Sequence, residues 1–323
     1  MHAIGDVAIT LPSCIALRQR FPLSRIDYIT GVSAQPLLEA LDLFDTIIPF
    51  PLCRNKFERL RAIRMLREQV RSASYEIVLD LQGNWVSRTI RLLANPKAWS
   101  EFDRVSPELA GSRVTKAFCS GGFLSLEPTY RAPLRPEILS GSERLLKENG
   151  WNSTRNLLLL NPAGLWATRQ WPDESYLQLA ELFSSADSWQ ILLMGTERIQ
   201  SRVERFLAGF GGSPVNLVGK TTLGEALAVL QKVRLVVSED SGLMHMAWIS
   251  GVPTIALFGS SRHDWSSPDG DHSRCLHSGD LPCGACMSPE CKYGDIHCLT
   301  RYSPSHVFNV ASDLLAATAK GSH

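Results

Sequence analysis

The sequence predicts an α/β protein built from two doubly wound domains with parallel sheets. Short β-rich runs alternate with amphipathic helical stretches, as is typical of parallel sheets covered by helices on both faces. At 323 residues, 44% of them hydrophobic, the chain can bury a core in each of two domains. Residues 106–142, rich in Gly, Pro and Ser, interrupt this rhythm, and we interpret them as loops and a linker. We therefore expect domains at 1–145 and 146–323.

The N-terminal domain combines three strand patterns with helical ones. The strands are predicted at Arg25–Thr30, Asp45–Phe50 and Glu76–Leu81, and the helices at Pro12–Arg20, Ala34–Leu41, Lys56–Arg71 and Trp85–Leu93. Gly5-Asp6 is typical of the turn before a helix that spans Val7–Arg20. Such a domain normally opens with a buried strand, for which Met1–Ile4 is too short. We therefore expect the first strand to be missing, in a chain that is truncated or annotated from an internal methionine.

The C-terminal domain shows the same alternation. Its strands are predicted at Asn156–Asn161, Gln190–Met194, Val215–Val218, Leu235–Ser238 and Thr254–Phe258. Its helices are predicted at Glu174–Phe183, Arg198–Leu207, Leu223–Gln231 and Leu243–Ile249, followed by a Cys-rich loop at 275–298 and a C-terminal helix.

Charge and composition exclude several classes of protein. With 33 Lys and Arg against 32 Asp and Glu, nothing favours binding to nucleic acid. No apolar run approaches the roughly 20 residues that span a bilayer, and the first residues lack the pattern of a signal peptide. We expect a cytoplasmic protein whose eight cysteines are reduced.

The most informative stretch is Val236–Pro268, where a buried strand leads through an acidic turn into a helix. The turn, Glu239–Gly242, delivers Asp-Ser-Gly to the start of a helix at Leu243. Free backbone N–H groups and the positive end of the helix dipole converge there, and a glycine lets a ligand approach the backbone. This geometry predicts an anion site of a general kind.

Four segments in order give this stretch a specific meaning. They are Ala3–Pro12, Tyr75–Asn84 with Ser87, Asn161–Gly164 followed by Thr168–Pro172, and the stretch Val236–Pro268, with Gly219-Lys220-Thr221 fitting the same pattern. Together they resemble the bacterial heptosyltransferases of glycosyltransferase family 9, which add heptose to the lipopolysaccharide inner core. The resemblance covers residues 3 to 318 and implies the GT-B fold, in which two Rossmann-like domains face a cleft.

By this resemblance Asp6 is the general base that takes the proton of the acceptor hydroxyl. The alternative from the residue alone is an aspartate that caps the first helix. Arg169 would neutralise the diphosphate leaving group, with Thr168 donating to the same phosphates. The family often has lysine at the position of Arg169, and arginine is not an equivalent replacement. A solvated loop charge is the alternative for Arg169.

The resemblance also assigns the donor site. Asp240, Ser241, Gly242 and His245 would form the corner for the donor phosphates, although Asp240 itself would order the turn or bind a sugar hydroxyl. A buried histidine with satisfied hydrogen bonds is the alternative for His245. Glu197 lies just beyond a strand and would bind a ribose hydroxyl, or it is only an acid at a helix start.

On the acceptor side, Asp80, Gln82 and Asn84 follow a strand and are candidate contacts, with turn capping as the alternative. A lipid acceptor implies peripheral contact with the inner membrane. The basic run within 54–71 is the candidate surface, or an ordinary solvated helix face: Arg54, Lys56, Arg59, Arg61, Arg64, Arg67 and Arg71.

A cysteine cluster is a separate signal. Cys283, Cys286, Cys291 and Cys298 lie within 16 residues and could hold a structural zinc or iron ion, or remain free thiols. Because the cluster is remote in sequence from Asp6, we assign it no catalytic role.

These observations predict an inverting, metal-independent transferase that moves heptose from ADP-L-glycero-D-manno-heptose to a Kdo- or heptose-terminated lipid A acceptor. The alternatives are a family member with another sugar or acceptor, an inactive truncated homologue, a nucleotide-sugar epimerase and a two-lobed binding protein. Fold alone does not choose among them.

Overall fold

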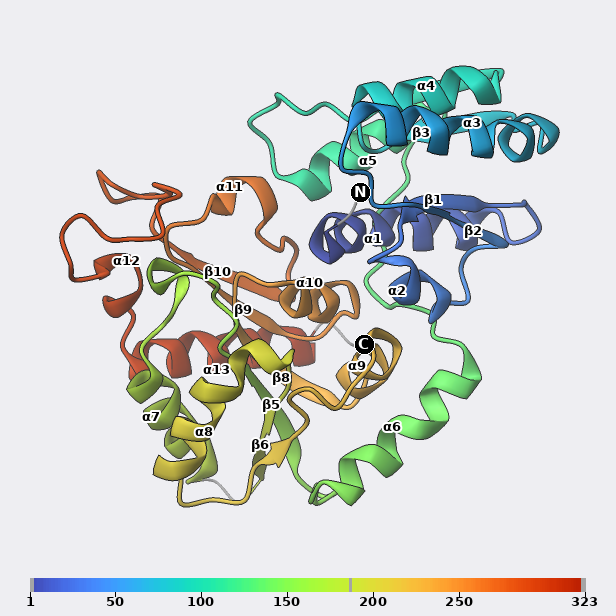
Figure 1. Cartoon of the computed structure of the whole chain (residues 1–323). Coiled ribbons are helices and arrows are strands. Elements are labelled where there is room, and N and C mark those ends of the chain that lie inside the picture. The colour runs from blue at the N-terminus through green and yellow to red at the C-terminus, as the bar shows by residue number, and fades with distance from the viewer. Residues whose placement is uncertain (1–2, 186–187, 321–323) are drawn as a thin grey trace. The chain divides into compact units, whose positions relative to one another are not determined.

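A computed structural model describes residues 3–185 and 188–320 (Figure 1). By its internal contacts the chain divides into two compact units, Met1–Pro133 and Leu134–His323. The boundary predicted from sequence, residue 145, falls inside helix α6 (Pro136–Glu148), which packs against α9 (Leu223–Leu230) of the second unit.

The second unit is organised around a six-stranded sheet with the order β10-β9-β8-β5-β6-β7. Every neighbouring pair in this sheet is parallel. Its strands are β5 (Asn156–Asn161), β6 (Trp189–Leu193), β7 (Val215–Asn216), β8 (Val233–Glu239), β9 (Thr254–Phe258) and β10 (Ser273–His277). The chain starts at β5 in the middle, adds β6 and β7 on one side, and returns to add β8, β9 and β10 on the other. This is the doubly wound order, with its switch point between β5 and β8.

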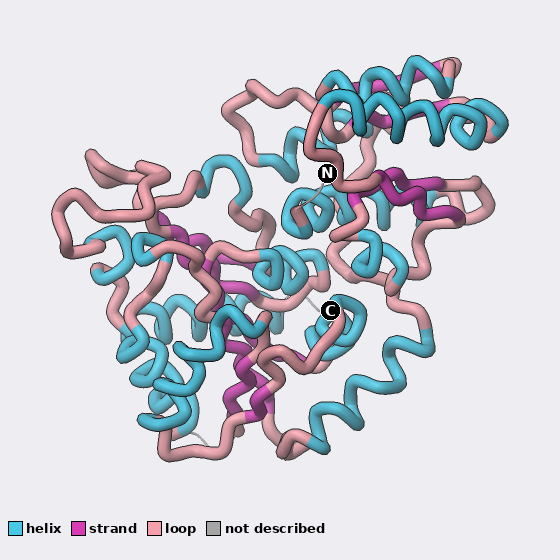
Figure 2. Tube along the Cα trace, in the orientation of Figure 1, coloured by secondary structure: helices cyan, strands magenta, loops and turns pink. Residues whose placement is uncertain are grey.

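Helices cover both faces of this sheet (Figure 2). One face packs against α7 (Asp173–Ser184), α8 (Gln200–Gly209) and α13 (Pro304–Lys320), through a core to which Ile255 and Leu257 of β9 contribute. The alternate residues of β9, Ala256 and Phe258, pack instead with Met244 of α10 (Gly242–Ile249). This alternation follows from the two-residue period of a strand, and it explains why the strands are apolar throughout.

Strand β5 shows how strongly this core is buried. Its four consecutive leucines, residues 157–160, have no solvent exposure. Burying each such side chain contributes roughly 1.5–3 kcal/mol relative to leaving it in water. The switch point is therefore built on a rigid central strand.

The first unit has two separate two-stranded parallel sheets, β1-β2 and β3-β4. The strands are β1 (Asp27–Gly31), β2 (Thr46–Phe50), β3 (Ile77–Asp80) and β4 (Ala98–Glu101). The helices are α1 (Ile4–Arg20), α2 (Gln35–Glu39), α3 (Lys56–Ser72), α4 (Trp85–Ala94) and α5 (Ala110–Ser120). A core of α3 and α4 residues packs with Ile29 of β1 and Val78 of β3, while α1 contacts α5.

The interpretation of residues 106–142 as loops and a linker is wrong, because α5 and the start of α6 lie there. In α5 the buried residues Val114, Ala117 and Phe118 follow a helical spacing, but small and polar neighbours mask it in the sequence. Strands β4 and β10 were also not predicted, because β4 has only four residues and both are partly polar.

The remaining elements are short segments at the carboxyl edge of the large sheet: η1 (Ala167–Arg169), η2 (Glu197–Ile199), α11 (His263–Ser266) and α12 (His297–Thr300). Among the described helices, none is both long and apolar enough to cross a membrane.

Candidate functional site

The candidate site of the second unit lies where β5 and β8 end. Asn161, the last residue of β5, pairs in register with Ser238 of β8. The segments that leave these two strands run to opposite sides of the sheet, and open α/β sheets bind ligands in the crevice that results.

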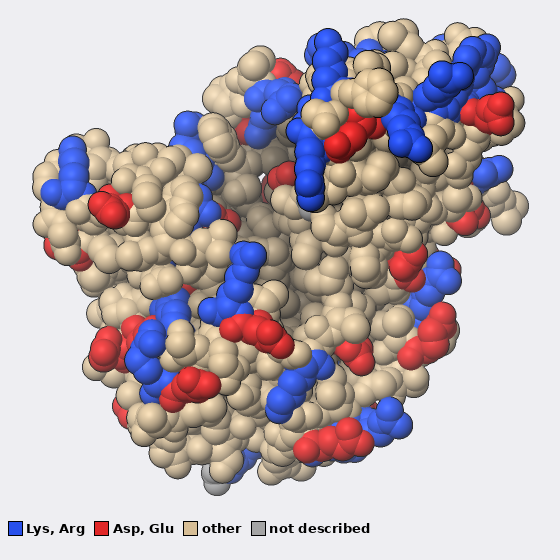
Figure 3. All heavy atoms as spheres, in the orientation of Figure 1, with Lys and Arg blue, Asp and Glu red and all other residues tan. Residues whose placement is uncertain are grey.

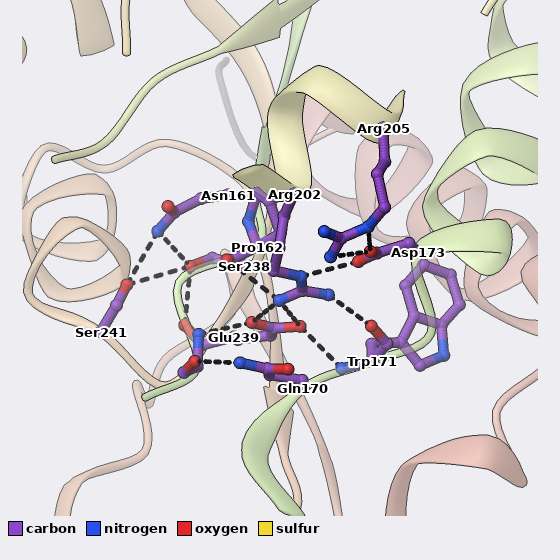
Figure 4. A network of polar contacts seen from close by, with 11 residues as sticks. Asn161, Pro162, Gln170, Trp171, Asp173, Arg202, Arg205, Ser238, Glu239 and Ser241 are labelled. Carbon is purple, nitrogen blue, oxygen red and sulfur yellow. Dashed lines mark hydrogen bonds and ion pairs between the residues drawn. The ribbon is translucent and has the colours of Figure 1, made fainter. Parts of the chain in front are cut away.

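Asn161 connects the two strand ends (Figure 4). Its Nδ2 donates to Ser238 Oγ at 2.9 Å and to Ser241 Oγ at 2.8 Å. Ser241 is the N-cap of α10, and its Oγ accepts from the backbone N–H of Met244 at 3.2 Å. The buried Asn161 Oδ1 has no hydrogen-bond partner among the described residues.

Helix α10 presents its N-terminus at this point. The sequence prediction of a strand, an Asp-Ser-Gly turn and a helix is confirmed, since β8 ends at Glu239 and α10 begins at Gly242. His245 lies one turn into α10, is 4% exposed, and its Nδ1 lacks a partner among the described residues. Burial lowers the pKa of His245 to about 4, so the imidazole is neutral at pH 7.

Arg169 points its guanidinium toward the same corner. Its Nη1 lies 3.4 Å from Asp240 Oδ2, and both side chains are only about 15% exposed (15% and 16%). The guanidinium also stacks on Trp166, with Arg169 Cζ 4.2 Å from the centroid of the indole ring. Arg169 is therefore not a solvated loop charge. It is a fixed cation close to the N-terminus of α10, and Asp240 orders it.

Thr168, which was predicted to donate to the donor phosphates, has its hydroxyl bonded within the protein. It is 2% exposed, and its Oγ1 donates to the carbonyl of Ser288 at 2.5 Å and lies 2.9 Å from Ser260 Oγ. Its hydroxyl thus ties the turn of η1 to the Cys-rich loop. Met287 of that loop also reaches Arg169, with 3.8 Å between Arg169 Nη2 and Met287 Sδ.

Glu197 begins η2 and is exposed at the carboxyl end of β6. A Cβ on Gly219 would come within 2.8 Å of Glu197 Cγ, and Gly219 has a positive φ of 70°. Glycine is therefore favoured at 219, because positive φ strains most other residues and a side chain there would displace Glu197. The carboxylate is left at the edge of the sheet, on the side of β5 opposite to β8.

In the first unit, Asp6 lies in the first turn of α1. The N-cap of this helix is Ala3, so Asp6 does not cap it. The side chain reaches the surface, yet surrounding protein displaces enough water to raise the pKa of the carboxyl above its ordinary value. A raised pKa makes the carboxylate a stronger base.

Asp80, Gln82 and Asn84 lie together in the turn between β3 and α4. Asp80 is 4% exposed, and its Oδ1 accepts from the N–H groups of Gln82 at 3.2 Å and Gly83 at 2.9 Å. Asn84 is the N-cap of α4 in a reciprocal capping box with Ser87. Asp80 and Asn84 thus organise the turn, and Gln82 is half-buried.

Three of the four cysteines considered as metal ligands lie in the loop before α12, and Cys298 lies within that helix. All are free thiols, and within residues 3–185 and 188–320 no group of three or more His, Cys, Asp and Glu side chains is placed to hold a metal. Two of the thiols have different partners: Cys291 Sγ lies 3.7 Å from Asp295 Oδ1, and Cys298 Sγ lies 4.0 Å from the carbonyl of Thr168.

A buried ion pair beneath the site was not predicted. Glu239 has no exposure and Arg202 is 7% exposed, and their side chains approach to 2.8 Å. Burial raises the pKa of Glu239 to about 7, while Arg202 and backbone N–H groups oppose that shift. The sequence offered one signal for this pair, an acid within an otherwise apolar strand end, but nothing that pointed to its partner.

The doubly wound fold and this corner define an α/β protein with an anion-binding site at the switch point of its sheet. Residues 132–297 match the profile of glycosyltransferase family 9 (heptosyltransferase), which is half of the chain. The chain belongs to this family and is a glycosyltransferase.

Similar proteins agree with this assignment. Lipopolysaccharide heptosyltransferase 1 of Pseudomonas aeruginosa is 24% identical, over 98% of this chain and 96% of that protein. The structure of the glycosyl transferase family 9 protein from Veillonella parvula superposes with a TM-score of 0.82 at 21% identity, covering 98% of this chain and 95% of that one. E. coli ADP-heptose LPS heptosyltransferase II gives 0.73 at 18% identity, covering 98% and 97%. These likenesses confirm the predicted GT-B fold.

Proposed function

We propose that this protein transfers heptose from ADP-L-glycero-D-manno-heptose to the inner core of lipopolysaccharide with inversion at the anomeric carbon. The family and the names of its relatives support this activity. The structural observation that carries it is the convergence of Arg169, Asp240 and the N-terminus of α10 at the switch point.

The donor diphosphate binds at this corner. The backbone N–H groups of Gly242 and Leu243 at the start of α10, the Ser241 hydroxyl and the Arg169 guanidinium all favour negative charge. Asp240 holds Arg169 in place before the donor binds, and the diphosphate then becomes the main counter-ion of that cation. Neutral His245 lines the corner as a hydrogen-bonding group. Glu197 accepts a hydrogen bond from a ribose hydroxyl.

Thr168 contributes through its position rather than by touching phosphate. Its hydroxyl fastens η1 to Ser260 and Ser288, so the adjacent Arg169 starts from a fixed backbone. Such preorganisation lets a cation stabilise charge that develops in the transition state without first having to reorganise.

The chemical step is a single displacement. An acceptor hydroxyl attacks the anomeric carbon, and the bond from that carbon to the diphosphate oxygen breaks. Asp6 takes the proton of the attacking hydroxyl, and ADP leaves with the bonding electron pair, its charge balanced by Arg169 and α10. These groups supply the electrostatic stabilisation, and we propose that the step needs no cofactor; a chelator should leave the rate unchanged.

The first unit receives the acceptor. Gln82 contacts it in the turn that Asp80 and Asn84 organise. Helix α3 meets the cytoplasmic face of the inner membrane, because its exposed basic side chains stand beside exposed apolar ones, Phe57 at 78% and Met65 at 75%. Figure 3 shows the basic side chains gathered over this part of the unit.

The test is incubation of the purified protein with ADP-heptose and two lipid acceptors, one ending in Kdo and one already carrying heptose, followed by mass spectrometry. One heptose added to one acceptor, and lost in Asp6→Ala, supports the proposal and identifies the step. ADP binding without product on either acceptor refutes the sugar or the acceptor. Absence of both binding and product refutes the transferase activity itself.

A further inference from the structure

The segment that carries Thr168 and Arg169 is a loop, residues 162–172, which we call the arginine loop. It leaves β5 after Asn161 and enters α7 at Asp173. Within it Ala167–Arg169 form the short helix η1, and Figure 4 shows residues near its two ends, Pro162 and Trp171, both beside Arg202. The position of Arg169 therefore depends on what holds those two ends.

The Glu239 carboxylate binds both ends of the arginine loop. Oε2 accepts from the backbone N–H of Gly164 at 2.5 Å, and Oε1 accepts from the backbone N–H of Trp171 at 2.6 Å. One fully buried side chain thus fixes the loop at its start and at its end. The bonds are made to main-chain groups, so they hold the loop backbone itself.

Arg202 of α8 holds the same two ends through their carbonyls. Nη1 donates to Pro162 O at 3.0 Å and Nη2 donates to Trp171 O at 2.6 Å, while Nη1 also donates to both oxygens of Glu239. Its Nε donates to Asp173 at 2.7 Å, so all three guanidinium nitrogens are occupied. A guanidinium suits this arrangement because its donors form a rigid planar fork.

Gly164 makes the loop compact. A Cβ at this position would lie 2.3 Å from the Arg169 carbonyl oxygen and 2.9 Å from Glu239 Oε2. The backbone of Arg169 therefore rests directly on Gly164, and any side chain there would displace it. Gln170 adds a further hydrogen bond across the loop, in which its Nε2 donates to Gly164 O at 2.8 Å.

The residues that follow Glu239 form the opposite side of the donor corner. The main chain of Glu239 continues directly into Asp240, the ion-pair partner of Arg169, and into Ser241, the cap of α10. Glu239 therefore lies next in the chain to the ion-pair partner of Arg169, while its side chain bonds to the arginine loop and Arg202. A buried ion pair contributes little net stability compared with apolar packing, which makes placement its main effect here.

From these contacts we propose that Glu239 and Arg202 are positioning residues for the transfer reaction, which act by fixing the arginine loop so that Arg169 faces the donor diphosphate. The proposal rests on the proposed function of Arg169. It assigns neither residue a contact with the substrate.

A double-mutant cycle tests it. Glu239→Gln keeps the shape of the side chain but places an amide NH₂ against a backbone N–H, and it removes the charge that Arg202 pairs with. We expect this variant to weaken ADP binding about 10-fold by calorimetry and to lower kcat about 10- to 100-fold. In an Arg169→Ala background the same change should cost less than about 2-fold in either quantity, because the group it positions is gone.

A matched control and a second variant keep the outcome interpretable. Arg205→Gln removes an exposed arginine bound to Asp173 and should leave both quantities unchanged. Gly164→Ala pushes on the Arg169 backbone without altering either charge, and should reproduce the Glu239→Gln loss. If Glu239→Gln does not fold, Gly164→Ala in both backgrounds gives the same cycle.

Hydrogen exchange gives a readout that needs no ligand. Peptides covering 162–172 should exchange faster in Glu239→Gln than in the parent, while peptides of β5 stay protected. The positioning role would be overturned if residues 162–172 exchange at the same rate in Glu239→Gln and in the parent. It would also be overturned if the losses of ADP affinity and kcat in Glu239→Gln add fully to those in Arg169→Ala. If Arg169→Ala alone leaves ADP binding and turnover intact, the proposed function of Arg169 fails instead, and the exchange result still decides the role of the pair.

Discussion

Arg169 and Asp240 form an ion pair at the point where the donor diphosphate is proposed to bind, with 3.4 Å between Nη1 and Oδ2. The carboxylate orients the cation but repels an incoming anion. We expect Asp240→Asn to bind ADP about 3- to 10-fold more tightly, as removal of a like charge at a partly buried site does. Calorimetry at two salt concentrations checks this. Weaker binding would mean that orientation of Arg169 outweighs repulsion.

Replacement of Arg169 should separate charge from shape. Arg169→Ala should lower kcat by about 10²- to 10³-fold, as loss of one preorganised group at a developing charge does. Arg169→Lys should recover part of this loss, because it keeps the charge but not the stack on Trp166. Steady-state kinetics of the three proteins provide the comparison, and Ala and Lys variants of equal activity would contradict it.

Asp6→Asn should abolish the base and leave donor binding intact. We expect kcat to fall by about 10²- to 10⁴-fold with an unchanged ADP affinity. Because the base acts deprotonated and its pKa is raised, kcat/KM of the parent should decline as pH falls, beginning above the range of an ordinary aspartate. If Asp6→Asn shows the same decline of kcat/KM at low pH as the parent, a group other than Asp6 causes that decline.

His245 should couple stability to pH. Its pKa is lowered to about 4 in the folded protein, so the unfolded chain binds the proton more tightly. The stability that neutral His245 contributes is therefore present above about pH 6.5 and is lost as pH falls toward 4, by up to roughly 3 kcal/mol. Denaturant unfolding of the parent and His245→Asn across this range measures the difference.

Glu239 should make the folded protein less stable as pH rises, which is the opposite of the effect of His245, over an overlapping range of pH. Its pKa is raised to about 7, so its ionisation destabilises the fold as pH rises from about 4.5 to 7. The curve of Glu239→Gln minus that of the parent should consequently slope opposite to the His245→Asn difference. Parallel slopes would contradict one of the two assignments.

Helix α3 should bind anionic vesicles. Replacing Arg61 and Arg64 by Gln should weaken sedimentation with vesicles containing anionic lipid by about 1 kcal/mol per residue. Replacing Phe57 and Met65 by Ser should weaken it further, because these exposed side chains supply the apolar contact. Neutral vesicles serve as the control. Unchanged binding in both variants would exclude α3 as the membrane surface.

Five of the six strands of the second unit were predictable, because most of them are apolar runs separated by helical patterns, whereas β10 is partly polar and was not predicted. The turn from Glu239 to Gly242 was predictable because the residues that form it are contiguous in the sequence. Element β4 and helix α5 were not, because their hydrophobic spacing is short or diluted by small residues.

The parts of the site that escaped prediction are contacts between distant segments. Glu239 and Arg202 are 37 positions apart, and Thr168 meets Ser288 across 120 positions. Local patterns carry no information about such pairs. The sequence indicated that Thr168 carries a hydroxyl near the donor corner, but only tertiary packing decides that this hydroxyl faces inward.

The bonds that hold the arginine loop are made to its main chain at Pro162, Gly164 and Trp171. The two ends of the loop are thus held through the main chain, and the side chains of Thr168 and Gln170 add further hydrogen bonds. Leu165 is 62% exposed, so its side chain can be exchanged while the bonds to the loop backbone stay in place. Variation of this loop is therefore tolerated at an exposed position such as Leu165, and excluded at Gly164, Arg202 and Glu239, which fix its backbone.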